Sequence, residues 1–299
     1  AGSSAVRRQR VSLNKYVKRL ERSLRSAASK FLRPRMKNRV YTIRAGLSRG
    51  LRRKGGLGFL PRRLSVEERH LRELELRGKT VYDVGGHEGA FTLFFARAVG
   101  SEGRVVTFEP NPDNYARLRE NLALNGLANV DARRLGISRQ AGKALLVCRG
   151  TETGTGTLQE DLKKSIEVED GHRSFEIEVD SLDHQIEAFN LPAPDFIKID
   201  VEGLEMEVIQ GMKTTLRDRK PALHIELHGL NGKWMRENAR QVAEFLMRFG
   251  YSILHVRSGV TFAEGSLLDM DPVRWGHFYC TCCAAARSGA AATATRGGN

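Results

Sequence analysis

Four side chains that lie close to two apolar segments are suited to acid–base chemistry: Asp200, Glu202, Glu226 and His228. The first two follow an apolar run, where a carboxylate is costly to bury unless it has a partner. An alcohol hydroxyl ionises too weakly near neutral pH to attack unaided, so a side chain that takes its proton can catalyse the attack. We expect these four residues to be catalytic. As an alternative, Asp200 could cap a helix that starts near Gly203, with Glu202 complementing its dipole.

The segment that contains Glu226 has a polar residue at every second position. His224, Glu226 and His228 alternate with apolar residues, and a period of two places all three on one face of a strand. Beside Asp200, such a face could hold a divalent metal ion. Successive residues on one face lie about 6.6 Å apart, however, which is too far for one ion to bind all three directly. We therefore expect a partly solvated face and no metal site.

A glycine-rich turn between two apolar runs indicates a nucleoside-bearing cofactor. Asp83 lies in a run that leads into Gly85, Gly86 and Gly89, and Glu109 ends the next run. Glycines let a backbone approach a ligand closely, and an acidic residue after the following strand can accept both hydroxyls of a ribose. Dinucleotide sites have the spacing G-x-G-x-x-G for their phosphates. The different spacing here, with Asp83 placed to repel a phosphate, favours S-adenosylmethionine, which is positively charged and has no phosphate.

These residues resemble the motifs of FkbM-family methyltransferases, within the seven-stranded S-adenosylmethionine-dependent class. The resemblance extends from about Val81 to His228. It rests mainly on Asp83-Val84-Gly85, Phe108-Glu109-Pro110-Asn111-Pro112, Val179-Asp180-Ser181-Leu182-Asp183, Ile197-Lys198-Ile199-Asp200-Val201-Glu202-Gly203 and Ile225-Glu226. Family members usually have Ala-Asn where this chain has Gly86-His87. The resemblance implies an enzyme that uses S-adenosylmethionine to methylate a hydroxyl of a glycan, a small-molecule carbohydrate or a natural product.

The predicted cofactor site combines the glycine turn with residues at the ends of neighbouring strands. In open α/β sheets, ligands bind beyond the carboxyl ends of the strands, where the strand order reverses. This rule places Asp83, Glu109, Gly136, Asp200 and His228 along one rim. With the positions that the resemblance implies, the predicted cofactor-binding residues are Asp83, Gly85, Gly86, His87, Gly89, Glu109, Asn111, Gly136 and Asp200.

Strands and helices alternate in a pattern that predicts a doubly wound α/β fold with a mostly parallel sheet. The resemblance implies seven strands in the Rossmann-like arrangement of class I methyltransferases. Residues 143–148 and 174–179 predict a small inserted strand pair around a Gly/Thr-rich loop, 150–157. After a short helix at 64–76, the predicted strands are 80–84, 104–109, 129–136, 195–200, 221–228 and a closing pair near 251–257 and 276–283, and the predicted helices are 89–99, 112–125, 203–216 and 234–248.

The distribution of charge divides the chain into two parts. Residues 1–64 contain 20 Lys or Arg and one acid, Glu21, for a net charge of +19, and since the whole chain carries +14 the remainder carries −5. Apolar spacing in the basic part predicts an amphipathic helix that ends near Pro34. Such a helix could pack on the domain, bind an anionic membrane surface or nucleic acid, or direct the chain to an organelle. We expect a basic extension at 1–63, a methyltransferase domain at 64–283 and a disordered tail at 284–299.

Cysteine usage favours a reducing compartment. The sequence contains Cys148 and a cluster of Cys280, Cys282 and Cys283, which lacks the second pair that a zinc site needs. No run approaches the roughly 18 apolar residues of a membrane-spanning helix. We expect an intracellular, soluble protein, cytoplasmic unless its N-terminal segment targets an organelle.

Two other functions fit parts of the sequence. Residues 109–126 also resemble tRNA guanine-N1 methyltransferases, and the basic N-terminal segment could hold an RNA backbone. Those enzymes have Asn-Leu-Pro or a similar turn after the fourth strand, where this chain has Asp200-Val201-Glu202-Gly203. This difference argues against an RNA substrate. A non-catalytic module, the second alternative, would bind S-adenosylmethionine without turnover.

Overall fold

The chain divides into two units, Ala1–Arg63 and Leu64–Asn299. In the first unit, strands β1 (Val40–Thr42) and β2 (Arg52–Lys54) pair antiparallel. The predicted basic helix apart from Leu32, the Gly/Thr-rich loop up to its last two residues and the C-terminal tail lie outside the described residues. The computed structural model describes Leu32 and residues 35–60, 62–148, 156–157, 171–229, 232–262 and 276–282.

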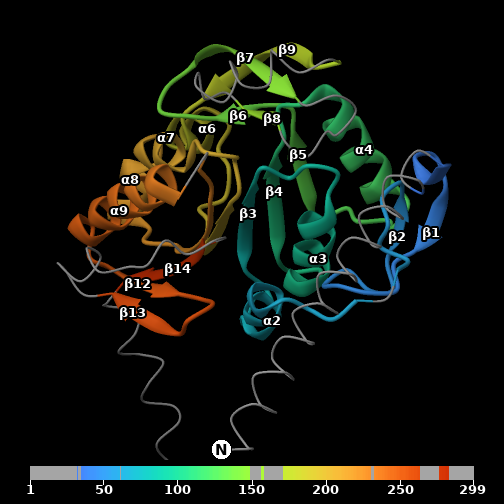
Figure 1. Cartoon of the computed structure of the whole chain (residues 1–299), viewed down its shortest axis with the longest axis horizontal. Helices are drawn as coiled ribbons and strands as arrows, with labels where there is room; N and C mark the ends of the chain where they lie inside the picture. The colour runs from blue at the N-terminus through green and yellow to red at the C-terminus, as the bar shows by residue number, and fades with distance from the viewer. Residues whose placement is uncertain are drawn as a thin grey trace, which may run out of the picture. The chain divides into compact units, whose positions relative to one another are not determined.

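The main sheet of the second unit has eight strands and is mostly parallel, which confirms the predicted fold class (Figure 1). Its strands are β3 (Thr80–Val84), β4 (Arg104–Phe108), β5 (Val130–Arg133), β10 (Phe196–Ile199), β11 (Ala222–Leu227), β12 (Tyr251–His255), β13 (Val260–Phe262) and β14 (Gly276–Cys282). They lie in the order β13-β12-β14-β11-β10-β3-β4-β5, and β11 to β5 are parallel. The seven predicted strands are present, and β13 adds a short edge strand. The order reverses beside β3, where a doubly wound sheet opens a ligand site.

Helices cover both faces of the sheet, which explains why its central strands are mostly apolar. The described helices are α2 (Val66–Glu73), α3 (Ala90–Val99), α4 (Pro112–Ala123), α6 (Leu182–Ala188), α7 (Glu205–Gln210), α8 (Lys213–Asp218) and α9 (Gly232–Arg248). Tyr82 and Ile197 pack on one face with residues of α7, α8 and α9. On the other face, Phe95 of α3 contacts Phe196. Among the described residues, no helix is long and apolar enough to cross a membrane.

A second sheet forms where the sequence predicts an inserted strand pair. β7 (Gly142–Cys148) and β9 (Arg173–Asp180) pair antiparallel, which confirms the pair. β6 (Gly136–Ile137) and β8 (Gly156–Thr157) extend the sheet to the order β6-β9-β7-β8. The predicted strand 129–136 is therefore too long. β5 ends earlier because the chain crosses between the sheets, and Gly136 already pairs with Val179.

The predicted helix 203–216 is divided into α7 and α8 at Gly211. The backbone there lies so close to the carbonyl group of Ser138 that a side chain would not fit. Asp183 of α6 stabilises the interruption, because its N–H donates to the carbonyl of Gly211 at 3.0 Å and its carboxylate accepts from the N–H of Thr215 at 2.9 Å. These contacts come from distant segments and override the local helical pattern.

Candidate active site

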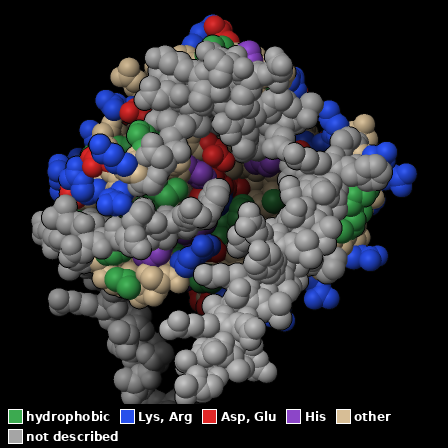
Figure 2. Space-filling view, in the orientation of Figure 1, with side chains coloured by type: hydrophobic (Ala, Val, Ile, Leu, Met, Phe, Trp, Pro, Cys, Tyr) green, Lys and Arg blue, Asp and Glu red, His purple; other side chains and the backbone are tan. Residues whose placement is uncertain are grey.

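A cavity of about 270 Å³ lies at the carboxyl ends of β3, β4 and β10. Its wall combines the glycine turn after β3, the residues after β4 and side chains of the inserted sheet. Figure 2 shows acidic and histidine side chains gathered with apolar ones in a hollow on one face of the molecule. Of the residues predicted from the sequence, the wall contains Gly85, Gly86, His87, Glu109, Asn111, Gly136, Asp200 and Glu202. Residues from distant segments therefore share one cavity.

The carboxylate of Glu109 is held by the backbone of two turns. Glu109 is buried and accepts hydrogen bonds from the N–H groups of His87 and Asn111, each at 2.8 Å. The side chain of Asn114 donates a third hydrogen bond at 3.3 Å. Burial raises the pKa of Glu109 to about 7, although the N–H donors oppose the shift. A carboxylate fixed in this way retains lone pairs that can accept ligand hydroxyls.

The glycines of the turn are required by the packing of the protein itself. A side chain at Gly85 would meet the carbonyl oxygen of Asp200, and one at Gly86 would meet the hydroxyl of Thr107. Gly85 also has a φ of 86°, which favours glycine. The reason inferred from the sequence, close approach of a ligand, is thus incomplete. Glycine at this turn first allows the end of β3 to lie against the end of β10.

Three of the predicted cofactor residues have roles in the framework of the site. Asn111 caps α4, because its Oδ1 accepts the N–H of Asp113 at 2.9 Å. Asp83 and Gly89 lie outside the described cavity wall. Asp83 is fully buried and accepts a hydrogen bond from Thr92 at 2.7 Å, and Gly89 precedes α3 with a φ of 90°. Direct contact of these residues with a cofactor stays a prediction.

A buried lysine lies between Asp83, at the end of β3, and Asp200, at the end of β10. Lys198 lies inside β10, and its Nζ is 3.3 Å from Asp83 Oδ1 and 3.2 Å from Asp200 Oδ2. Its ammonium group also lies 4.8 Å from the centre of the Phe91 ring. Burial opposes the charge, but the carboxylates outweigh it and raise the pKa of Lys198. No role was predicted for Lys198, although a charged residue within an apolar strand is a signal for one.

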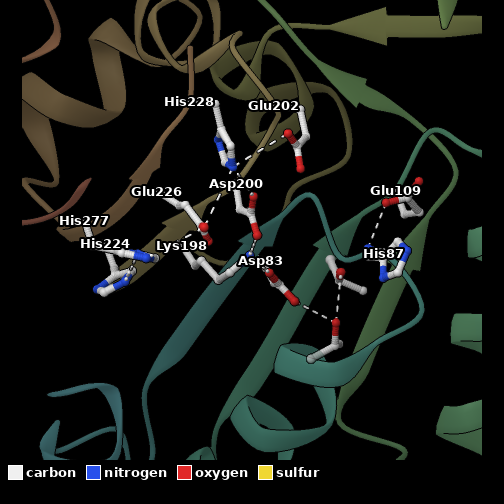
Figure 3. Close-up of polar contacts among 12 residues, drawn as sticks. Asp83, His87, Glu109, Lys198, Asp200, Glu202, His224, Glu226, His228 and His277 are labelled. Carbon is white, nitrogen blue, oxygen red and sulfur yellow. Dashed lines mark hydrogen bonds and ion pairs between the residues drawn. The ribbon is translucent and has the colours of Figure 1, made fainter. Parts of the chain in front are cut away.

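The four residues predicted as catalytic meet in one cluster (Figure 3). His228 Nε2 lies 3.8 Å from Asp200 Oδ1, 3.7 Å from Glu202 Oε2 and 3.8 Å from Glu226 Oε1. Glu202 has a positive φ of 51°, a conformation that is retained mainly where the surrounding structure enforces it. The alternative role of Asp200 as a helix cap is wrong, because α7 begins at Glu205 and no side chain caps it.

The ring of His228 is oriented by a carboxylate that was not predicted. His228 Nδ1 donates to Glu205 Oε1 at 2.9 Å, and Glu205, which is fully buried, also accepts from Asn238 of α9 at 2.8 Å. His228 directly follows β11, which ends at Leu227, and its Nε2 approaches Glu226 Oε1 to 3.8 Å. The two side-chain tips thus converge more closely than the spacing of about 6.6 Å between their positions along the strand.

Crowding of carboxylates shifts the proton affinities in the cluster. Burial, with the nearby charge of Asp200, raises the pKa of Glu226 to about 7. Burial lowers the pKa of His228, but the surrounding carboxylates outweigh it and raise the pKa to about 10. Beside the cluster, His277 lies 3.7 Å from Glu226 and 3.2 Å from His224, and burial lowers its pKa to about 4. The cluster thus combines several carboxylates with a His228 ring that they keep protonated at neutral pH.

The chemistry of the cavity wall fits S-adenosylmethionine. Ile137 and Leu146 offer apolar surface for an adenine ring, Glu109 offers a carboxylate for ribose hydroxyls, and Asp200 offers negative charge for a sulfonium or ammonium group. Among the described residues of the wall there is no Lys or Arg, so the phosphates of a dinucleotide would have no cationic side chain there.

Comparisons with known proteins agree with this chemistry. A family model described as "Methyltransferase FkbM domain" matches residues 83–253, more than half of the chain. Methyltransferase 1 of Beauveria bassiana is 28% identical over 144 residues, which cover 44% of this chain and 57% of that protein. Hexuronic acid methyltransferase AglP of Haloferax volcanii is 28% identical over 153 residues, which cover 50% of this chain and 55% of that protein. The matches thus span somewhat more than half the length of these curated relatives.

Among solved structures, the chain is similar to a methyltransferase FkbM from Methylobacillus flagellatus. The two are 17% identical with a TM-score of 0.46, and the match covers 72% of this chain and 50% of that chain. It is also similar to an S-adenosylmethionine-dependent O-methyltransferase from Thermotoga maritima. That pair is 14% identical with a TM-score of 0.40, and the match covers 73% of this chain and 64% of that chain.

Proposed function

The chain belongs to the FkbM family of S-adenosylmethionine-dependent methyltransferases, and we propose that it methylates a hydroxyl group of a carbohydrate or natural-product acceptor. The proposal is carried by one observation: the cavity that fits the cofactor and the cluster around His228 share Asp200. The name of the relative AglP, a hexuronic acid methyltransferase, supports a carbohydrate acceptor.

We assign the cofactor to the cavity between the turn after β3 and the end of β4. Glu109 accepts the ribose hydroxyls, because backbone N–H groups already orient its carboxylate. Gly136 and the inserted sheet contribute the opposite wall, and Asp200 faces the positively charged end of the cofactor. When bound, S-adenosylmethionine supplies a methyl group on a positively charged sulfur, which an oxygen nucleophile can attack.

The cluster acts on the acceptor. Transfer to a hydroxyl requires that its oxygen is aligned with the methyl group and that its proton is removed. We assign these tasks to Asp200, Glu202, Glu226 and His228. The carboxylates accept a hydrogen bond from the acceptor hydroxyl and take its proton, and the ring of His228, which is held by Glu205, fixes their spacing.

The purified chain, incubated with methyl-labelled S-adenosylmethionine and separate acceptors, tests this function. Suitable acceptors are hexuronates, neutral sugars, natural-product alcohols and tRNA. We expect label in a hydroxyl-bearing acceptor, and we expect Glu226→Gln to abolish it. Glu237→Gln, which removes an exposed carboxylate of α9, is the matched control. Label in tRNA would favour an RNA methyltransferase, and cofactor binding without transfer would favour a non-catalytic module.

We also propose that residues 1–63 attract an anionic partner, either a membrane surface or a nucleic acid, and that the catalytic domain begins at Leu64. The proposal is supported by the charge of +19 on residues 1–64 and by the division of the chain into units after Arg63. Binding of this kind weakens as salt is added, because the charges involved are exposed and become screened.

A further inference from the structure

We propose that Asp200, Glu226 and His228 form a binding site for one divalent metal cation. One ligand atom of each side chain lies within 4.8 Å of the others. The residues come from the end of β10, from β11 and from the position after β11, so they meet only in the folded chain. Two carboxylates and one imidazole are a mixed set of ligands that accommodates Mn²⁺ or Zn²⁺.

The distances suit atoms that share a cation better than atoms that bond to each other. His228 Nε2 lies 3.8 Å from both Asp200 Oδ1 and Glu226 Oε1, which is beyond hydrogen-bonding range. Two atoms that each lie about 2.1 Å from one ion are about 3 to 4 Å apart, depending on the angle at the ion. The two separations from His228 Nε2 therefore already fall in the range of a shared ligand sphere, and the ligand atoms of Asp200 and Glu226 lie within 4.8 Å of each other.

A separate observation, the fixed ring of His228, also indicates a metal ligand. Its Nδ1 donates to the fully buried Glu205, and this leaves Nε2 directed at the other carboxylates. Histidines that bind metals usually donate their second ring nitrogen to such a partner, because the partner fixes the tautomer and the ring orientation. Asp200 is prepared in a similar way, since Lys198 holds its Oδ2 while its Oδ1 faces His228.

The cluster also has an excess of negative charge. Four carboxylates surround His228: Asp200, Glu202, Glu205 and Glu226. Against these four carboxylates stand the imidazole ring of His228 itself and the ammonium group of Lys198, which is shared with the buried carboxylate of Asp83. Carboxylates held this close in a partly buried site repel one another strongly. A divalent cation at the centre would displace the proton from His228 Nε2 and offset this repulsion.

The catalytic role of the cation rests on the proposed function, methyl transfer to a hydroxyl, and adds a step to it. Because Asp200 also lines the cofactor cavity, an acceptor hydroxyl bound to the cation would lie near the methyl group. A bound divalent ion lowers the pKa of a hydroxyl. Glu202, which is not among the three ligands, takes the proton. The O–H bond breaks, and the oxygen forms a bond to the methyl carbon as the bond from that carbon to sulfur breaks.

Binding of Mn²⁺ to the full chain, first freed of metal by dialysis against EDTA, tests the site without acceptor or turnover. Electron paramagnetic resonance of the free ion is expected to show one Mn²⁺ bound per chain. We expect Glu226→Gln and His228→Gln each to weaken binding about tenfold or more. Glu237→Gln, at the exposed carboxylate of α9, should bind Mn²⁺ like the unchanged protein.

An absence of saturable Mn²⁺ binding, or equal binding by all variants, overturns the metal site. Circular dichroism checks the fold of each variant, and Asp200→Asn replaces any variant that fails to fold. If the unchanged protein binds no Mn²⁺ and Asp200→Asn loses S-adenosylmethionine, the cluster holds the ammonium group of the cofactor instead. Methyl transfer that persists in EDTA refutes the catalytic role of the cation and leaves the proposed function intact. Mn²⁺ binding without transfer to any hydroxyl refutes the proposed acceptor class alone.

Discussion

The two sides of the site are built in opposite ways. On the glycine-turn side, Glu109 accepts hydrogen bonds of 2.8 Å from the backbone of His87 and Asn111. On the cluster side, three carboxylates lie 3.7 to 3.8 Å from His228 Nε2, too far to form hydrogen bonds with it. On the first side, the hydrogen bonds that hold the carboxylate of Glu109 are all present in the folded chain. The second is arranged around a position that another positive or hydroxyl-bearing group can fill.

This difference separates binding from chemistry. A carboxylate that is fixed by backbone donors is preorganised, so that it binds a ligand without reorganising. Carboxylates that repel one another instead hold an unfavourable arrangement, which a substrate or a cation relieves. Lys198 couples the sides, because its ammonium group contacts Asp83 below the turn and Asp200 in the cluster.

The largest effect is expected from neutralising the cluster. Asp200→Asn or Glu226→Gln should reduce kcat by about 10²- to 10⁴-fold, because the cluster that orients and deprotonates the acceptor hydroxyl loses one of its carboxylates. Steady-state kinetics with the acceptor, alongside calorimetry for S-adenosylmethionine, measures the effect and locates it. Loss of cofactor affinity in Asp200→Asn would place its carboxylate at the ammonium group of the cofactor. Full activity in both variants would contradict the assignment of the cluster to catalysis.

Removing the connection between the sides should destabilise the fold. Lys198→Met leaves the carboxylate of Asp83 buried without its counter-charge, which typically costs about 3–5 kcal/mol of unfolding free energy. Urea denaturation followed by circular dichroism measures this change. Lys143→Met is the control, because Lys143 pairs with Glu176 on the surface and its loss should leave the midpoint almost unchanged. Equal stability of the two variants would show that the buried lysine has no structural role.

A smaller effect is expected on the glycine-turn side. Glu109→Ala should weaken the binding of S-adenosylmethionine by about 1.5–3 kcal/mol, the range for hydrogen bonds that involve a charged group. Isothermal titration calorimetry measures the affinity, and Glu178→Ala, at an exposed position of β9, serves as the control. An unchanged affinity would move the cofactor to another part of the molecule.

The pH dependence of cofactor binding should come from the same residue. Burial raises the pKa of Glu109 to about 7, with the charge of Asp83 acting in the same direction, and the neighbouring Cys148 stays neutral because burial raises its pKa. The ribose hydroxyls need an ionised acceptor, so affinity should fall up to about tenfold per unit as pH drops below 7. Calorimetry at pH 6 and pH 8 checks this, and Glu109→Gln should abolish the difference.

The same shift in pKa makes the contribution of Glu109 to stability fall as pH rises, whereas its contribution to cofactor affinity rises with pH. Glu109 binds a proton more tightly in the folded chain than at the ordinary value of 4.5. Its contribution to the free energy of unfolding is therefore largest below about pH 4.5 and is lost as pH rises to about 7. Comparing the unfolding of the unchanged protein with that of Glu109→Gln at both ends of this window isolates the contribution.

The smallest effect on the site is expected from removing residues 1–63. A chain that starts at Leu64 should bind S-adenosylmethionine as tightly as the full chain, because the cavity residues all belong to the second unit. The shortened chain should no longer bind anionic vesicles or RNA at low salt, because it lacks the positive charge of the basic segment. Insolubility, or failure to bind the cofactor, would show that the segment belongs to the catalytic domain.

The sequence by itself determined the glycine-turn side of the site, because most of its interactions are local. β3, α3 and β4 follow one another with short connections, and the apolar runs of the two strands predict that they are buried on both faces. The position of Glu109 after β4, at the same edge as the glycine turn after β3, follows from the parallel pairing of adjacent strands. Its placement beside the turn could therefore be inferred without knowing the rest of the fold.

The tertiary structure alone decided the cluster side. Glu226 and His228 lie beside Asp200 because β11 pairs with β10, and this pairing joins segments that are distant in the chain and is not given by the period of the sequence. Glu205 reaches His228 only because α7 packs beside β11, and Lys198 reaches Asp83 across paired strands from 115 positions away in the chain. Local periodicity reports which face a side chain occupies, and packing between distant segments decides what it meets there.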